Sequence, residues 1–181
     1  MEIALNLAAV PASPPDTVLN FAYGSNLLTR RIQARVPSAR VVTLATLAGH
    51  RLCWHKMGRD GSGKCDVMST GVPGDLVIGV VYRMPTADKQ LLDQIEGLGA
   101  GYDEKEVPLA TASGPLRAWT YCATDIDLDA RPFDWYQALV VAGAHEHGFP
   151  AAYLAELKKI PARADPDIAR ARSNFGLIGS L

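Results

Sequence analysis

The feature that most constrains the fold is a continuous apolar run from Leu76 to Tyr82, which follows a Pro-Gly-Asp turn. This run has seven residues, counting one glycine, whereas a helix needs roughly 20 apolar residues to cross a bilayer. A strand that is apolar at consecutive positions has to be covered on both faces. We therefore expect a strand over 76–84 that lies inside the protein, with other elements packed on both sides.

Strand signals and helix signals alternate along the rest of the chain. Short runs rich in β-branched and apolar residues, bounded by glycine or proline, predict strands at 18–23, within 40–57 as one or two strands, at 102–111 and at 116–124, the last two as a hairpin. Apolar residues at helical spacing predict helices at 27–36, 87–95, 133–146 and 151–160, and a further helix within 165–175. This interleaving predicts a mixed α/β or α+β domain.

Length and composition indicate one domain with short extensions. The chain has 181 residues, of which 48% are hydrophobic, which is enough for a single core. Prolines at positions 11, 14 and 15 disfavour regular structure, so residues 1–16 are expected to be a flexible lead-in. The domain itself is placed at 17–163, and 164–181 is expected to form a C-terminal helix and tail.

The charge limits the expected partners, and the cysteine content indicates the expected cellular compartment. The net charge of −1, without a block of like charges, gives no electrostatic case for nucleic acid or an anionic membrane as a partner. The first residues carry Glu2 and no positive charge, unlike a secretory signal. Three cysteines without a Cys-x-x-Cys pair are typical of free thiols in a reducing cytoplasm.

Two patterns resemble cofactor sites but lack the required details. Residues 58–64 match Gly-x-x-x-x-Gly-Lys, but Cys65 stands where a phosphate loop has Ser or Thr, and Pro73 leaves no room for the helix that must follow. We interpret this segment as a solvent-exposed hairpin loop, with a phosphate site at Lys64 as the alternative. A zinc site is not expected, because no zinc spacing is matched by His50, Cys53, His55 and Cys65.

The turn Gly24-Ser25-Asn26 connects the first predicted strand to the helix predicted at 27–36. Backbone N–H groups from Gly24 to Leu28 lie at the start of this helix and cannot be satisfied within it. Such a row binds an anion, for example an α-carboxylate or a developing oxyanion, and Gly24 lets a ligand approach closely. Ser25 or Asn26 is the expected N-cap. Ser25 has no sequence-identifiable His and Asp partners for a nucleophilic triad.

A second candidate feature ends the helix predicted at 87–95. Glu96 lies beside a bend with glycines at 97, 99 and 101, which indicates a backbone that passes tightly around something. A carboxylate in such an apolar bend can transfer protons. The alternative is an ordinary glycine C-cap followed by a surface loop, and from this segment alone the C-cap interpretation is favoured.

Three segments taken together resemble the γ-glutamylcyclotransferase family. They are Phe-Ala-Tyr-Gly-Ser-Asn-Leu at 21–27, Gly-Asp-Leu-Val-Ile-Gly-Val-Val-Tyr at 74–82 and Asp-x-x-Glu-Gly-x-x-x-Gly-Tyr at 93–102. The helix that begins near Trp135 and runs to Gly148-Phe-Pro150 looks like the C-terminal part of the same family. The resemblance covers about residues 18–160 and leaves the region 40–70 and both ends of the chain uncovered.

The resemblance implies an α+β fold, a small mixed β-barrel or twisted sheet flanked by helices, with the Tyr-Gly-Ser-Asn loop and a catalytic glutamate on either side of one cavity. The family cleaves γ-glutamyl amides by attack of the substrate's own α-amine on its γ-carbonyl, which releases 5-oxoproline and a free amine without a cofactor or a metal. Glu96 matches the catalytic position. It would move a proton from the attacking amine to the departing nitrogen.

The resemblance also implies which residues bind the substrate. They are the loop residues Tyr23, Gly24, Ser25 and Asn26, together with Tyr121 and, as a weaker candidate, Tyr136. The backbone amides of residues 23–25 would hold the substrate and stabilise its tetrahedral oxyanion, and Tyr121 would donate a hydrogen bond. The sequence does not determine which amine the substrate releases, nor whether the protein forms a homodimer. Two alternatives remain: a non-catalytic γ-glutamyl-binding module, which would not need Glu96, and a γ-glutamyl hydrolase or tailoring enzyme on the same fold.

Overall fold

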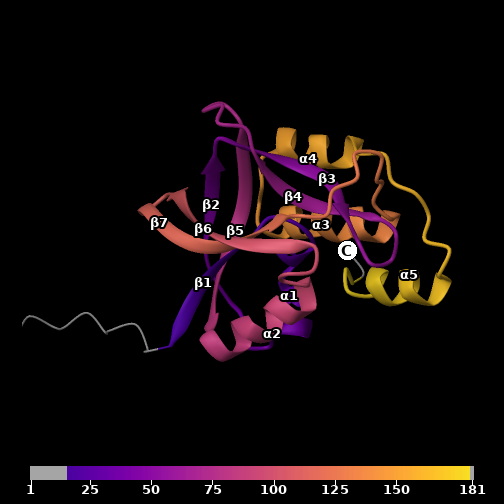
Figure 1. Cartoon of the computed structure of the whole chain (residues 1–181), viewed down its shortest axis with the longest axis horizontal. Coiled ribbons are helices and arrows are strands. Elements are labelled where there is room, and N and C mark those ends of the chain that lie inside the picture. Colours follow the sequence, from indigo (N-terminus) through magenta and orange to yellow (C-terminus); the bar gives the residue numbers. More distant parts are fainter. Residues whose placement is uncertain (1–15, 180–181) are drawn as a thin grey trace, which may run out of the picture.

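A closed five-stranded barrel forms the centre of the computed structural model, which describes residues 16–179 (Figure 1). The lead-in expected at 1–16 therefore lies outside the described residues, apart from Asp16. The strands run in the order β1-β5-β2-β6-β7 around the barrel, with bounds β1 (Thr17–Ala22), β2 (Arg40–Ala48), β5 (Leu76–Pro85), β6 (Tyr102–Thr111) and β7 (Gly114–Ala123). The predicted α+β class with a small barrel is confirmed.

Strand β5 is the apolar run on which the fold prediction was based. It pairs antiparallel with both β1 and β2, and Val80, Val81 and Tyr82 are completely buried. The barrel closes where β1 meets β7 in a parallel pairing of Asn20 with Trp119. The prediction of an interior strand is confirmed, because consecutive apolar residues are covered from both faces.

The apolar segment 40–57 divides into two strands that belong to different sheets. Strand β2 ends at Ala48, and Gly49, at φ +69°, makes the turn into β3 (His50–Met57). Strand β3 pairs antiparallel with β4 (Gly63–Ser69) as a separate two-stranded sheet beside the barrel. The loop between β3 and β4 is the hairpin predicted around residues 58–63.

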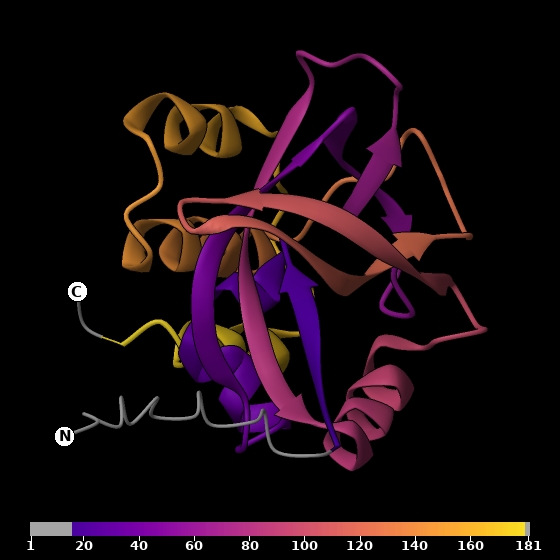
Figure 2. The same cartoon turned by 90° about the vertical axis from the view of Figure 1, so that its left-hand side faces the viewer.

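Helices cover two regions of the barrel surface (Figures 1 and 2). Helix α2 (Thr86–Glu96) lies at one end of the barrel, and α3 (Asp134–Glu146) lies beside the barrel, with α4 (Ala151–Lys159) and α5 (Ile168–Phe175) packed on α3. The predicted helices at 87–95, 133–146 and 151–160 are confirmed within one residue, and the C-terminal helix is present. No helix among residues 16–179 is long and apolar enough to cross a membrane.

The single helix predicted over 27–36 is wrong in its first turn. A short 3₁₀ turn, η1 (Ser25–Leu27), precedes Leu28 in an extended conformation, and helix α1 (Thr29–Arg35) starts only afterwards. Neither Ser25 nor Asn26 caps a helix with its side chain. A carboxylate from α3 takes that role, because Glu146 accepts a hydrogen bond of 2.9 Å from the Thr29 amide.

The close approach between η1 and α3 is made possible by Gly143. A Cβ atom at this position would lie 2.3 Å from the Leu28 nitrogen and 2.5 Å from the Leu27 carbonyl carbon. Contacts this short cannot be relieved by a side-chain rotation, because backbone atoms are involved. The glycine therefore fixes how deeply the turn after β1 lies against α3.

We expect Gly143→Ala to lower the free energy of unfolding by about 1–3 kcal/mol, although alanine has the higher helix propensity, because η1 has to move away from α3. The matched control is Gly74→Ala, where the added Cβ meets no atom within 4 Å and a change within about 0.5 kcal/mol is expected. Urea denaturation of both variants measures the difference. Equal stabilities would show that η1 does not depend on this contact.

Candidate active site

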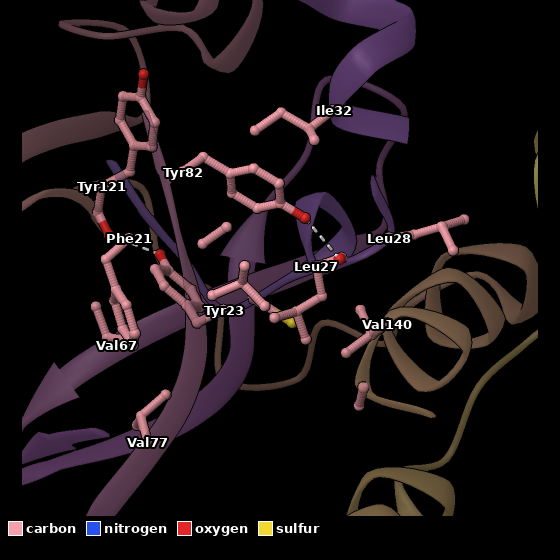
Figure 3. Packing of buried hydrophobic residues seen from close by; sticks show 14 of the residues in the cluster. Phe21, Tyr23, Leu27, Leu28, Ile32, Val67, Val77, Tyr82, Tyr121 and Val140 are labelled. Atoms are coloured by element: carbon pink, nitrogen blue, oxygen red, sulfur yellow. Dashed lines mark hydrogen bonds between the residues drawn. The ribbon is translucent and has the colours of Figure 1, made fainter. Parts of the chain in front are cut away.

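The turn after β1 is held in place by hydroxyl groups from the core (Figure 3). Tyr82 donates a hydrogen bond of 2.9 Å to the carbonyl oxygen of Leu27, and Tyr23 donates one of 2.6 Å to the carbonyl oxygen of Tyr121. The imidazole Nε2 of His147 also lies 3.0 Å from the Leu27 oxygen. The turn is thus tied to the barrel interior and to the end of α3.

Gly24 lies in a narrow space between β4 and α3. A Cβ atom here would lie 3.0 Å from both Cys65 Cβ and the Tyr136 hydroxyl. Its φ of −107° is open to other residues, so close packing and not backbone conformation explains the glycine. The amide groups that follow Gly24 are consequently near the surface of a hollow and near Tyr136.

Glu96 is brought to this turn by the end of α2. Gly97, at φ +81°, ends the helix as the predicted C-cap, and residues 98–100 form the exposed loop expected after it, whereas the Glu96 side chain contacts the turn after β1. The carboxylate Oε1 accepts hydrogen bonds of 2.8 Å from the Asn26 side-chain amide and 2.6 Å from the Arg35 guanidinium. Two motifs about 70 residues apart in sequence therefore meet through one carboxylate oxygen.

Two neighbouring hollows share this carboxylate. The inner hollow, of about 40 Å³, is lined by all seven residues predicted for the site: Tyr23, Gly24, Ser25, Asn26, Glu96, Tyr121 and Tyr136. The outer hollow, of about 300 Å³, shares Ser25, Glu96, Tyr102 and Tyr136 with the inner one. The predicted residues thus meet in one place, and Glu96 stands on the wall common to both hollows.

The hydroxyl groups of the site tyrosines already have protein partners. Tyr121 donates a hydrogen bond of 2.6 Å to Asp93, whereas the Tyr136 oxygen accepts one of 3.1 Å from the Cys65 amide. Burial raises the pKa of Tyr121 well above its usual value, and the Asp93 carboxylate raises it further. Burial likewise raises the pKa of Tyr136. Both side chains are neutral at physiological pH.

Three residues that the sequence analysis did not assign to the substrate site also line the hollows. Tyr102, just after the glycine bend, donates a hydrogen bond of 2.8 Å to the Cys65 carbonyl. Arg35 pairs with Glu96, and Cys65 lies against Gly24. Burial raises the pKa of the Cys65 thiol, so it is protonated and not a nucleophile. Only the Gly-Tyr pair at 101–102 carried a local signal, because the other contacts depend on the tertiary fold.

Asn20 supplies an unusual polar group to the inner hollow. The residue is 1% exposed, and its Oδ1 has no hydrogen-bond partner among residues 16–179. Buried acceptors are rarely left without a donor, since an unmet one costs about 1–3 kcal/mol. A polar residue in the otherwise apolar strand predicted at 18–23 was the available sequence signal. The hollow offers an acceptor suited to an ammonium or hydroxyl group of a ligand.

The hairpin loop at residues 58–63, predicted to be solvent-exposed, is exposed only at Arg59 and Gly61. Ser62 is completely buried, and the Lys64 ammonium pairs with Asp60 at 2.8 Å and lies 4.9 Å from the centre of the Tyr136 ring. Burial alone would raise the pKa of Asp60, but the hydrogen bonds from Lys64 and Ser62 lower it overall. Lys64 belongs to strand β4, so the helix that a phosphate loop requires is not there.

The histidines and cysteines considered for zinc have other surroundings. The His55 imidazole lies 2.9 Å from the Asp66 carboxylate, whereas Cys65 lines the inner hollow. Within the described part of the chain, no three His, Cys, Asp or Glu side chains are grouped so that they could hold a metal ion.

Comparisons with known proteins show the family of this chain. The AIG2-like family model matches residues 76–157. The human protein named γ-glutamylcyclotransferase is 35% identical over 153 residues, which are 80% of this chain and 79% of that protein, and the mouse protein of the same name is 36% identical over 151 residues with the same coverage. The chain belongs to the γ-glutamylcyclotransferase family.

Solved structures place the γ-glutamylcyclotransferase fold over most of the chain. A structure titled γ-glutamyl cyclotransferase has a TM-score of 0.79 at 30% identity and covers 89% of this chain and 99% of its own. A structure of an uncharacterized human protein has a TM-score of 0.75 at 32% identity, covering 86% and 97%. The family resemblance inferred from three segments is confirmed.

We expect Asn20→Leu to raise the free energy of unfolding by about 1 kcal/mol, because it removes a buried acceptor without a donor, and to weaken turnover of a γ-glutamyl amide. The matched control is Thr120→Val on the adjoining strand, whose hydroxyl donates a hydrogen bond of 3.0 Å to Phe21. That variant should lose about 1 kcal/mol. Denaturation with urea and a turnover assay measure both effects. A destabilised Asn20→Leu with full activity would contradict this role.

Proposed function

We propose that this chain is a γ-glutamylcyclotransferase that converts γ-glutamyl amides to 5-oxoproline and a free amine. The observation that carries the proposal is the position of the Glu96 carboxylate, which shares one small hollow with the backbone amides of the turn after β1. The reaction needs both: a base for the attacking amine and donors for the oxyanion of the tetrahedral intermediate. Family membership supports the same activity.

The turn after β1 would bind the γ-glutamyl group. None of the amide N–H groups of Gly24, Ser25 and Asn26 donates to a backbone carbonyl among the described residues. Oriented amides in a hollow with little water stabilise a developing negative charge without reorganising during the reaction. The unpaired Oδ1 of Asn20 would accept a hydrogen bond from the substrate's α-ammonium group.

Glu96 would act as the proton shuttle. Both of its protein hydrogen bonds go to Oε1, so Oε2 has no such partner among residues 16–179 and is available to the α-amine. After it takes a proton from this amine, the same carboxylate can pass the proton to the departing nitrogen. Asn26 and Arg35 would orient the carboxylate, and the Tyr121 and Tyr136 rings would shape the hollow.

The proposed reaction would proceed without a metal or a cofactor, because the substrate supplies the nucleophile and Glu96 would supply the base. Holding the α-amine close to the γ-carbonyl provides an effective molarity that an outside nucleophile does not reach. The small inner hollow favours a folded γ-glutamyl group over an extended one. Substrate shape and a single carboxylate would therefore provide most of the rate acceleration.

We expect Glu96→Gln to keep the fold and to lose turnover by roughly 10²-fold or more, because the amide cannot accept the proton. The assay follows 5-oxoproline formation from a γ-glutamyl amide. The control is Glu106→Gln, an exposed carboxylate on β6 paired with Arg117, which should have wild-type activity. Near wild-type turnover of Glu96→Gln would remove Glu96 from the mechanism and leave Asp93 and Glu104 as the next carboxylates to test.

The identity of the nucleophile separates cyclisation from hydrolysis on the same fold. We expect a γ-glutamyl amide to yield 5-oxoproline without glutamate, and its N-acetylated form to be unreactive, because acetylation removes the attacking amine. Chromatographic quantification of both products measures this. Glutamate as the product, or cleavage of the acetylated amide, would identify water as the nucleophile and the protein as a hydrolase. Binding of the amide without either product would indicate a non-catalytic binding module.

A further inference from the structure

The outer hollow carries an excess of positive charge. Its ionisable lining residues, tyrosine aside, are five cationic side chains and two carboxylates: Arg31, Arg35, Lys56, Arg59, Lys64, Asp60 and Glu96. Two ion pairs account for both carboxylates, Lys64 with Asp60 and Arg35 with Glu96. Arg31, Lys56 and Arg59 are therefore left without a carboxylate partner among the described residues.

Lys56 is the most unusual of these three cations. The residue is only 6% exposed, and its Nζ makes no hydrogen bond or ion pair with any residue in the range 16–179. Its nearest aromatic neighbour is the Tyr102 ring, whose centre is 4.7 Å away. Burial lowers the pKa of Lys56, which reflects the unfavourable removal of an ammonium group from water. An anion entering the hollow would compensate for this loss.

The glycine-rich bend after Glu96 is built around this ammonium group. A Cβ atom at Gly101 would lie 2.9 Å from Lys56 Nζ, and Gly101 itself has a φ of +124°. On the other side, a register shift in β3 between Cys53 and Lys56 changes the pairing with β4 just where the lysine is presented. Gly101 thus lies directly against the Lys56 ammonium group at the wall of the outer hollow, and the lysine follows the irregular part of β3.

The second buried cation strengthens the charge of this hollow. Arg31 is 8% exposed, and its guanidinium is held by the Ser25 hydroxyl at 2.9 Å and by the Asn174 side chain at 2.8 Å, both of which are neutral. Burial lowers its pKa to about 10, and the nearby Arg35 contributes to the same shift. Arg59 is exposed at the rim of the same hollow.

We propose that Lys56 determines specificity by binding a carboxylate on the departing amine of the substrate. The inference rests on the proposed function: with the γ-glutamyl group in the inner hollow, the amine that leaves past Glu96 has to extend into the outer one. A carboxylate there would meet Lys56 and, at the rim, Arg59. Substrates whose departing part is an amino acid would then be preferred over those that release an uncharged amine.

Two substrates of nearly equal size test this proposal, γ-glutamyl-alanine and γ-glutamyl-alaninamide, which differ in the charge of the departing part. The wild-type protein should convert the first with a kcat/KM about tenfold or more above that of the second, as expected for one charge-assisted contact. Lys56→Met should abolish this preference through a higher KM for γ-glutamyl-alanine and leave kcat/KM for the alaninamide unchanged. Lys56→Arg should retain the preference, and the exposed Lys105→Met should equal the wild type.

Equal wild-type kcat/KM values for the two substrates would overturn the role of Lys56 while leaving the proposed function intact. The same conclusion follows if Lys56→Met lowers both values alike, because a purely structural lysine would not distinguish the charge of the departing part. If Lys56→Met does not fold, which circular dichroism shows, the wild-type ratio and its retention in Lys56→Arg decide the question. Failure of both substrates to give 5-oxoproline would overturn the proposed function and this inference with it.

Discussion

The rest of the site depends on the close packing of the turn after β1 against its neighbours. The turn lies between Gly143 on one side, where no Cβ fits, and Cys65 with Tyr136 on the other, where Gly24 makes the close contact. The Tyr82 hydroxyl then donates to the Leu27 carbonyl oxygen of the turn, and the Tyr23 hydroxyl of the turn donates to the Tyr121 carbonyl oxygen of β7. Backbone groups held from three directions move little, which is what an oxyanion site requires, because donors that must reorient during the reaction contribute less.

Electrostatic contacts divide the site into two regions with different tasks. The inner hollow is lined by tyrosines that burial keeps neutral, and its one charged lining residue within residues 16–179 is Glu96, beside the turn after β1 and the unpaired Asn20 oxygen. The outer hollow has a surplus of buried cations. Arg35 contributes to both regions, because its ion pair with Glu96 orients the carboxylate on the shared wall. This division matches a substrate whose two halves differ in charge and in chemical role.

Local signals in the sequence predicted most of the fold and only part of the site. The apolar run of β5, the glycine C-cap at Gly97 and the prolines that bound α4 are local features, so the elements they define could be located. The break at Leu28 could not, because it depends on a tyrosine and a histidine that reach Leu27 from β5 and α3. The sequence carried no signal for Arg35 or Lys56 for the same reason, because a charged residue on a helix or strand is normally solvated. Only the tertiary fold places Arg35 against Glu96 and Lys56 against Gly101.

In the proposed reaction, the position of Glu96 between the two hollows suits the path that the proton would take. The α-amine that gives up a proton would lie in the inner hollow, and the nitrogen that receives it would lie toward the outer one. A carboxylate fixed deep in either hollow would reach only one of these atoms, since proton transfer requires hydrogen-bond distance to both in turn. A glutamate at the last position of a helix meets this requirement: its backbone is held by the C-cap, while its Oε1 is fixed by Asn26 and Arg35 and its other oxygen is left for the substrate. The glycine bend that follows ends the helix at Glu96, and Gly101 leaves space for Lys56, which in the proposed complex would face the departing part of the substrate.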